Sequence, residues 1–170
     1  MVPPDSISNQ PVPSCKWIYV DTSGRVVSDK RYDYAKQFSE GLAAVRVGKF
    51  WGYIDEAGEM AIPPTFETAE GFSEGFALVS QNERFGYIDR TGVFVISPQF
   101  DYAEDFSEGK AVVGDGKTRF WFIDRTGKQA LSGQFALASN FFKGLSHVKL
   151  MSGDFAYIDG SGKTVFSYRP

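Results

Sequence analysis

The stretch from residue 51 to residue 79, WGYIDEAGEMAIPPTFETAEGFSEGFALV, contains the pattern that decides the fold of this chain. Its clearest element is an aromatic residue, then Ile or Val, then Asp, two variable residues and Gly. This element occurs five times, with its aspartates at Asp21, Asp55, Asp89, Asp124 and Asp159, spaced 34, 34, 35 and 35 residues apart. A unit of this length cannot bury its own apolar face, so neighbouring units must cover one another.

Each unit predicts three strands. A first apolar strand, such as residues 51–55, returns through a second one, residues 60–62, after an Asp-x-x-Gly step that is typical of a bulged hairpin loop. The second strand ends at prolines, which cannot continue a ladder of backbone hydrogen bonds. The third strand follows a Phe-Ser-Glu-Gly motif and alternates small and branched residues, as in Ala77 and Val79. This alternation indicates a face that another sheet approaches closely.

The linker between the second and third strands carries an aromatic residue, an alanine and a phenylalanine at steps of three, as in Phe66, Ala69 and Phe72. This spacing predicts a single helical or 3₁₀ turn that places its rings between neighbouring units.

We therefore expect an all-β tandem array of about five β-repeats of 34–35 residues, with three strands per unit. The expected domains are an extended, proline-containing leader and a single repeat domain, at residues 1–16 and 17–170. The units of that domain are 17–50, 51–84, 85–119, 120–154 and a partial unit at 155–170.

Two architectures compete: an open, solenoid-like or superhelical stack, and a five-bladed, propeller-like closed ring. The ring needs the leader to supply a missing third strand. The open stack is favoured because the leader holds four prolines and lacks the Gly-x-Ala-x-Val pattern of the other third strands.

The repeated units resemble the bacterial WG repeat, also called the KWG repeat, over nearly everything after Lys16. Trp51-Gly52 and Phe85-Gly86 keep the aromatic-Gly dipeptide, whereas the fourth unit has Phe120-Trp121 there and Ser132-Gly133 in place of the prolines. The resemblance implies an all-β repeat protein of bacterial type, usually without a known biochemical activity. It supplies no catalytic residue.

Composition narrows the classes of partner. The 18 basic and 21 acidic residues give a net charge of −3, which offers no basic footprint for nucleic acid or an anionic membrane. We therefore expect no nucleic acid, no membrane insertion and no cofactor. The single cysteine, Cys15, excludes an internal disulfide and a multi-cysteine metal site. Either the bacterial cytoplasm or, if a leader has been removed, the cell envelope fits this sequence as its location.

Catalytic interpretations are weak. Glu40, Glu74 and Glu108 could align as the carboxylates of a glycosidase, but acid and base catalysis needs two different environments rather than copies of one. We expect these side chains to accept backbone hydrogen bonds or to face solvent. Cys15 and His147 form the one conceivable thiol–imidazole pair, and each Asp-x-x-Gly loop offers a single carboxylate, too few for calcium. The chain is therefore expected not to be an enzyme.

The function expected from the sequence is a non-enzymatic repeat scaffold or binding module whose partner is another protein. The alternative is carbohydrate or cell-envelope binding through exposed aromatic rings. Residues that break the repeat are the best candidates for partner binding, because repeated positions serve the core. These are Trp121, Phe142, His147, Asp115, Lys117 and Arg119.

Overall fold

The computed structural model describes residues 16–20, 26–27 and 30–169. Apart from Lys16, the expected leader at residues 1–16 lies outside the described residues. Within the described part of the chain, all regular structure is β and there is no helix. The all-β prediction is confirmed.

In residues 30–169, fifteen strands form four antiparallel sheets, each with its strands in sequence order. The first sheet contains β1 (Tyr34–Ala35), β2 (Leu42–Val47), β3 (Phe50–Asp55) and β4 (Met60–Phe66). The second contains β5 (Thr68–Ser73), β6 (Phe76–Gln81), β7 (Arg84–Ile88) and β8 (Phe94–Phe100). The third contains β9 (Tyr102–Ala103), β10 (Lys110–Gly114) and β11 (Phe120–Asp124). The last contains β12 (Leu137–Ala138), β13 (Leu145–Lys149), β14 (Phe155–Asp159) and β15 (Thr164–Tyr168).

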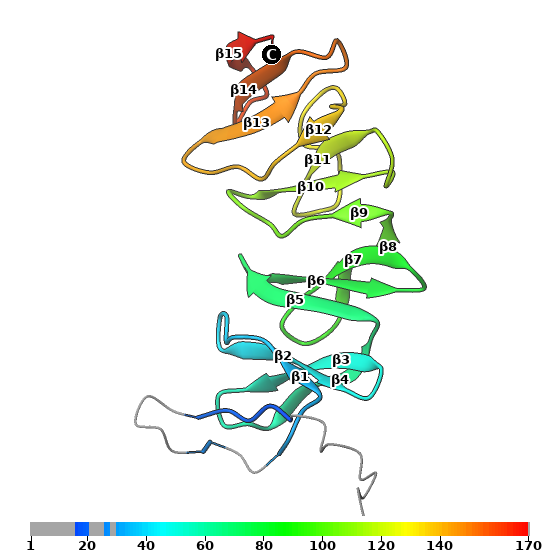
Figure 1. Cartoon of the computed structure of the whole chain (residues 1–170), viewed down its shortest axis with the longest axis vertical. Coiled ribbons are helices and arrows are strands. Elements are labelled where there is room, and N and C mark those ends of the chain that lie inside the picture. Colours follow the sequence, from blue (N-terminus) through cyan, green and yellow to red (C-terminus); the bar gives the residue numbers. More distant parts are fainter. Residues whose placement is uncertain (1–15, 21–25, 28–29, 170) are drawn as a thin grey trace, which may run out of the picture.

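The four sheets follow one another along the longest axis of the molecule, from β1–β4 at one end to β12–β15 at the other (Figure 1). The strands form no closed barrel. Each sheet takes its first two strands from one sequence unit and the following hairpin from the next, so the sheets tie successive units together. The preference for an open stack over a propeller-like ring stays a prediction.

The four Asp-x-x-Gly steps within the described residues form the predicted hairpin loops, whereas the step that begins at Asp21 lies outside them. In the first sheet Gly58 N donates to Asp55 O at 2.9 Å, and Asp55 Oδ1 accepts the N–H groups of Ala57 and Glu59 at 3.0 and 2.9 Å. Gly58 has a φ of 79°, a left-handed conformation that favours glycine. The same bonds recur in the loops that begin at Asp89, Asp124 and Asp159. Turn chemistry therefore accounts for the repetition of Asp and Gly.

The linker does not form the predicted helical or 3₁₀ turn. It is extended and supplies one more strand to each sheet, as in β5. The pairing of β5 with β6 shifts register between Ala69, opposite Val79, and Phe72, opposite Ala77. Because the bulge lets three residues of one strand oppose two of the other, Ala69 and Phe72 both enter the same core. A bulged strand thus produces the spacing that indicated a helical turn.

The core lies between consecutive sheets, as mutual coverage of the units requires. We call the face of a sheet that is turned toward the following sheet its outer face. Tyr53, on the outer face of the first sheet, is fully buried and packs on Phe72 of the second with ring centres 5.1 Å apart. Its hydroxyl donates to Glu70 O at 2.8 Å, and burial raises its pKa. Tyr87 and Phe122 are buried in the same way against Phe106 and Phe141.

The Phe-Ser-Glu-Gly motifs join the sheets through a ladder of hydrogen bonds. Ser73 Oγ donates to Phe106 O at 2.8 Å, and Glu74 Oε2 accepts the N–H of Gly109 at 2.9 Å. Glu74 has a φ of 53° and forms, with the next glycine, a two-residue turn. Matching bonds link Ser39 to Phe72, Glu40 to Gly75, Ser107 to Phe141 and Glu108 to Gly144. The glutamates are therefore backbone acceptors, as expected.

The glycine of the aromatic-Gly dipeptide is required by a close backbone crossing. A β-carbon at Gly52 would lie 2.4 Å from Ile62 O, and one at Gly86 would lie 2.7 Å from Ile96 O. In both sheets the proline-containing strand shifts register twice as it crosses this position. At Trp121 the crossing strand is reduced to isolated bridges, so a side chain fits there. The departure from the dipeptide in the fourth unit thus follows from the loss of its second strand.

Candidate partner-binding surface

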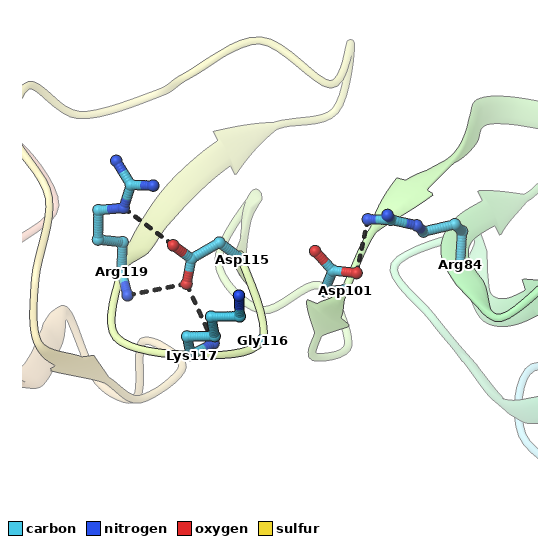
Figure 2. A pocket seen from close by; sticks show the side chains of 6 residues that line it. All are labelled: Arg84, Asp101, Asp115, Gly116, Lys117 and Arg119. Carbon is cyan, nitrogen blue, oxygen red and sulfur yellow. Dashed lines mark hydrogen bonds and ion pairs between the residues drawn. The ribbon is translucent and has the colours of Figure 1, made fainter.

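Three of the predicted residues lie together in the loop between β10 and β11. Asp115, Lys117 and Arg119 line a hollow of about 590 Å³ together with Arg84 and Asp101 (Figure 2). Arg119 Nε donates to Asp115 Oδ2 at 2.9 Å, and Arg84 pairs with Asp101 at 2.6 Å. Asp115 Oδ1 also accepts the N–H groups of Lys117, Thr118 and Arg119, each at 3.1 Å.

The longer loop explains this arrangement. In the preceding sheets, the acidic residue at the position of Asp101 closes the corresponding loop: Asp33 accepts the N–H of Gly48 at 2.7 Å, and Glu67 accepts those of Asn82 and Glu83. In the third sheet Asp115 closes its own loop, which leaves Asp101 to pair with Arg84.

Most of the charged side chains in this hollow are already paired with one another. The Arg119 side chain, with three backbone N–H groups, holds the pKa of Asp115 well below its usual range, so this carboxylate is committed to the loop. The two ion pairs are solvent-exposed, and pairs of this kind contribute little. These loop residues are therefore brought together by local structure.

Trp121 lies apart from the other candidates. It is partly buried on β11 and packs edge-on against Phe100, with ring centres 6.3 Å apart. Both belong to the core between the second and third sheets. The structure thus gives Trp121 a packing contact.

Phe142 is the most exposed aromatic residue in or next to the last sheet, with 73% of its surface accessible. It occupies the position of the ladder serine, in the turn before β13, and Lys143 replaces the ladder glutamate. Neither side chain can form the bonds of the ladder, because Phe has no hydroxyl and Lys accepts no hydrogen bond. The ladder therefore ends at this turn.

His147 lies on the outer face of the last sheet, among aromatic residues from β14 and β15. Its ring packs nearly parallel to that of Phe155 at 5.3 Å, and its Nε2 lies 3.2 Å from the Tyr168 hydroxyl. Tyr157, Phe166 and Tyr168 are 39%, 59% and 41% exposed. We call this set the terminal aromatic face: His147, Phe155, Tyr157, Phe166 and Tyr168.

In each of the first three sheets, the surface that corresponds to the terminal aromatic face is buried. Tyr157 occupies the position of Tyr53, Tyr87 and Phe122, which are fully buried under the following sheet. His147 replaces the buried Ala44, Leu78 and Val112. Of this face, only His147 was among the predicted residues. Phe155 and Tyr157 keep the aromatic pattern of the repeat, whereas Phe166 and Tyr168 replace Ile62 and Pro64, and this departure from the repeat is the signal that could have identified them.

The opposite end of the array is partly covered. Residues 17–20 lie over the first sheet, and with residues 35–38 they line a hollow of about 320 Å³. The Tyr19 hydroxyl donates to Lys36 O at 2.6 Å, and burial raises the pKa of Tyr19 to about 12. Residues 21–25, which continue from this lining, lie outside the described residues, as does Cys15 of the conceivable Cys15–His147 pair.

The described residues include no group of three or more His, Cys, Asp or Glu side chains placed to hold a metal ion. Nor does the described part of the chain contain a helix long and apolar enough to cross a membrane.

Solved structures with a similar fold are β-propeller-like. Hsv2 from Kluyveromyces lactis matches with a TM-score of 0.57 and 11% identity, over 85% of this chain and 54% of that one. BamB from Moraxella catarrhalis matches with a TM-score of 0.54 and 13% identity, over 86% of this chain and 57% of that one. The chain thus spans little more than half the length of either protein, and the likeness concerns the fold alone.

No curated protein matches this chain. The sequence profile of a family described as "WG containing repeat" matches residues 17–49, 51–84 and 85–117, three consecutive copies that together cover more than half of the chain. The recognised pattern and the sheet-by-sheet packing agree with this match. The chain therefore belongs to the WG repeat family.

Proposed function

We propose that this chain is a non-enzymatic repeat scaffold that binds a protein partner on its terminal aromatic face. One observation carries the proposal: the outer face that is buried under a following sheet in the first three sheets is uncovered in the last, yet it remains aromatic. Exposed aromatic clusters commonly mark protein interaction surfaces, because large rigid rings bury much area at a low cost in conformational entropy. Repeat arrays commonly present such surfaces to partners.

The absence of catalysis is part of this proposal. Two repeated sets of acidic residues have a fixed geometry: the glutamates of the Phe-Ser-Glu-Gly motifs and the aspartates of the Asp-x-x-Gly loops. Both sets accept backbone hydrogen bonds. On the terminal aromatic face, the hydrogen-bonding partner of His147 is the hydroxyl of Tyr168. These arrangements support a structural role for each group.

The test is a comparison of partners captured by two variants. The double variant Phe166→Ser, Tyr168→Ser removes two exposed rings, whereas Val93→Ser changes a residue of similar exposure, 61%, in the loop between β7 and β8. Each tagged protein is incubated with lysate of the native host, and retained proteins are quantified by mass spectrometry. We expect the wild type and Val93→Ser to retain the same protein and the double variant to lose it. Equal retention by all three would contradict the proposal.

Carbohydrate binding is the alternative, because the nearly parallel rings of His147, Phe155 and Tyr168 could also stack on sugars. The same variants separate the two functions. Calorimetric titration of the wild type with cell-envelope glycan fragments should give no heat of binding if the partner is a protein. Heat that disappears in the double variant would favour the carbohydrate instead.

A further inference from the structure

Strand β15 is an edge strand with little to prevent the pairing of another strand. All five of its residues, Thr164–Tyr168, are exposed, and its sequence TVFSY contains no proline, glycine or charge. It stands at the end of the strand order of the last sheet. An edge strand presents unpaired backbone N–H and C=O groups, and proteins usually guard such edges with proline, charge or irregular backbone.

The corresponding strands of the first two sheets carry those guards. β4 contains Pro63 and Pro64, β8 contains Pro98, and each shifts register twice against its neighbour. At the positions of Pro63 and Pro64, β15 has Ser167 and Tyr168. Its pairing there is regular, residue by residue: Phe155 with Tyr168, Ala156 with Ser167 and Tyr157 with Phe166. The last sheet thus keeps the strand but lacks the prolines.

Charge around β15 indicates what kind of strand would fit. Lys163 precedes it and Arg169 follows it. Arg169 pairs with Asp154 at 2.7 Å, whereas Lys163 forms no ion pair within the described part of the chain. The edge is therefore apolar in its centre and basic at its ends.

A second copy of this chain would fit this edge poorly. Antiparallel pairing of two β15 strands centred on Phe166 places Lys163 of one copy opposite Arg169 of the other. Like charges directly opposite one another destabilise a pair of strands. A strand with a carboxylate on each side of its apolar centre would instead place opposite charges at both ends.

We propose that β15 receives an added antiparallel strand from the partner protein, an extended segment with an apolar centre flanked by acidic residues. This inference rests on the proposed function and adds the mode of binding and the chemistry of the bound segment. Alternate side chains of the added strand would lie beside Phe166 and Tyr168 and would extend the terminal aromatic face. Main-chain hydrogen bonds supply affinity in this mode, and the side chains supply specificity.

A synthetic peptide tests the inference without a known partner. The probe is a fluorescently labelled, capped peptide of sequence ETVFVTE, and its controls are KTVFVTK and the first peptide N-methylated on alternate amides. Ser167→Pro removes a backbone N–H at a position where β4 holds Pro63, and Ser167→Ala is the matched control. Lys163→Glu reverses one flanking charge. Binding is measured by fluorescence polarisation, and the fold of each variant is checked by thermal melting.

We expect the acidic peptide to bind the wild type, with binding weakened about tenfold or more by Ser167→Pro and by N-methylation but unchanged by Ser167→Ala. Lys163→Glu should reduce the preference for the acidic peptide over the lysine-flanked one. Equal binding of the N-methylated peptide, or stronger binding of the lysine-flanked peptide to the wild type, would overturn the inference. Dimers of this chain that Ser167→Pro abolishes would replace the partner strand with a second copy.

The two proposals can fail separately. If neither peptide binds while the Phe166→Ser, Tyr168→Ser variant loses a protein from lysate, strand addition with this chemistry is wrong and the proposed function stands. If the peptides behave as expected while that double variant keeps every protein from lysate, the terminal aromatic face is not where the native partner binds.

Discussion

The second sheet, β5–β8, and the last sheet, β12–β15, carry the same pattern in different surroundings. Tyr87 of the second sheet is fully buried, and its hydroxyl donates to Glu104 O at 2.7 Å. Tyr157, at the same position of the last sheet, is 39% exposed. The residue type is the same, so the presence of a following sheet decides whether this ring is core or surface.

The two sheets differ mainly on the side that faces outward. Inward-facing residues of the last sheet, such as Val148, Ala156 and Ile158, are as buried as their counterparts. Outward positions have changed: His147 replaces Leu78, and Phe142 and Lys143 replace the ladder residues Ser73 and Glu74. The last sheet thus receives the sheet before it in the usual way and offers a different surface to whatever lies beyond.

The largest difference should come from truncating the tyrosine in each sheet. Tyr87→Ala leaves a cavity in the core and is expected to lower the free energy of unfolding by about 4 kcal/mol. Tyr157→Ala removes a partly exposed ring and should cost less than about 1 kcal/mol. Urea denaturation of both variants measures the difference. Equal losses would show that Tyr157 is as well packed as Tyr87.

The close backbone crossing gives the next effect. Gly86→Ala places a β-carbon 2.7 Å from Ile96 O and should destabilise the fold by about 3 kcal/mol, because two backbone segments must move apart. In the last sheet β15 passes Ala156 in regular register and leaves room for its side chain, so the reverse change Ala156→Gly should cost only about 1 kcal/mol. Thermal melting of the two variants compares them. A harmless Gly86→Ala would exclude steric crowding as the reason for this glycine.

The hydrogen-bond ladder predicts a smaller asymmetry. Ser73→Ala removes the bond to Phe106 O and should cost about 1 kcal/mol. Phe142→Ser restores the ladder residue in the last sheet, where the described residues include no following sheet to accept its bond, so stability of this chain should change by less than about 0.5 kcal/mol. Chemical denaturation is the measurement. A stabilising Phe142→Ser would indicate that this turn has an acceptor after all.

The smallest effect depends on pH. Burial raises the pKa of Asp105, with a further contribution from the nearby Glu70, and its Oδ1 has no hydrogen-bond partner among the residues that the structure describes. The corresponding residue in the last sheet is Asn140. Because the folded-state pKa lies above the unfolded one, ionised Asp105 opposes folding at pH values above its folded pKa, and this penalty disappears as the pH falls to the unfolded value. Asp105→Asn should therefore raise the melting temperature at pH 7 and lose that advantage near pH 3. A gain that is independent of pH would point to another cause.

Local chemistry made much of the fold predictable from the sequence. The hairpin loops follow from Asp55 and Gly58, and the tight packing between sheets follows from small residues such as Ala77, because these signals depend only on near neighbours. The prediction of a helical or 3₁₀ turn in the linker was wrong because a bulge in β5 and a helical turn give the same spacing of three.

The surface was harder to predict for a different reason. Exposure of Tyr157 and Phe166 depends on the absence of a covering sheet, which the residues themselves do not encode. Breaks in the repeat selected His147, which lies on the terminal aromatic face, but the same criterion selected Trp121, whose side chain replaces a glycine only because the crossing strand is missing. An irregular residue can therefore reflect local backbone structure as readily as binding.

The loop closed by Asp115 has a consequence for how such arrays diversify. Its carboxylate accepts three backbone N–H groups of its own loop, so one residue was added without altering the bonds that join the sheets. Growth of a loop is thereby uncoupled from the pitch of the stack. The peptide bond between Lys117 and Thr118 is accordingly a suitable insertion site, where an epitope or a sensor peptide can be displayed on a rigid frame.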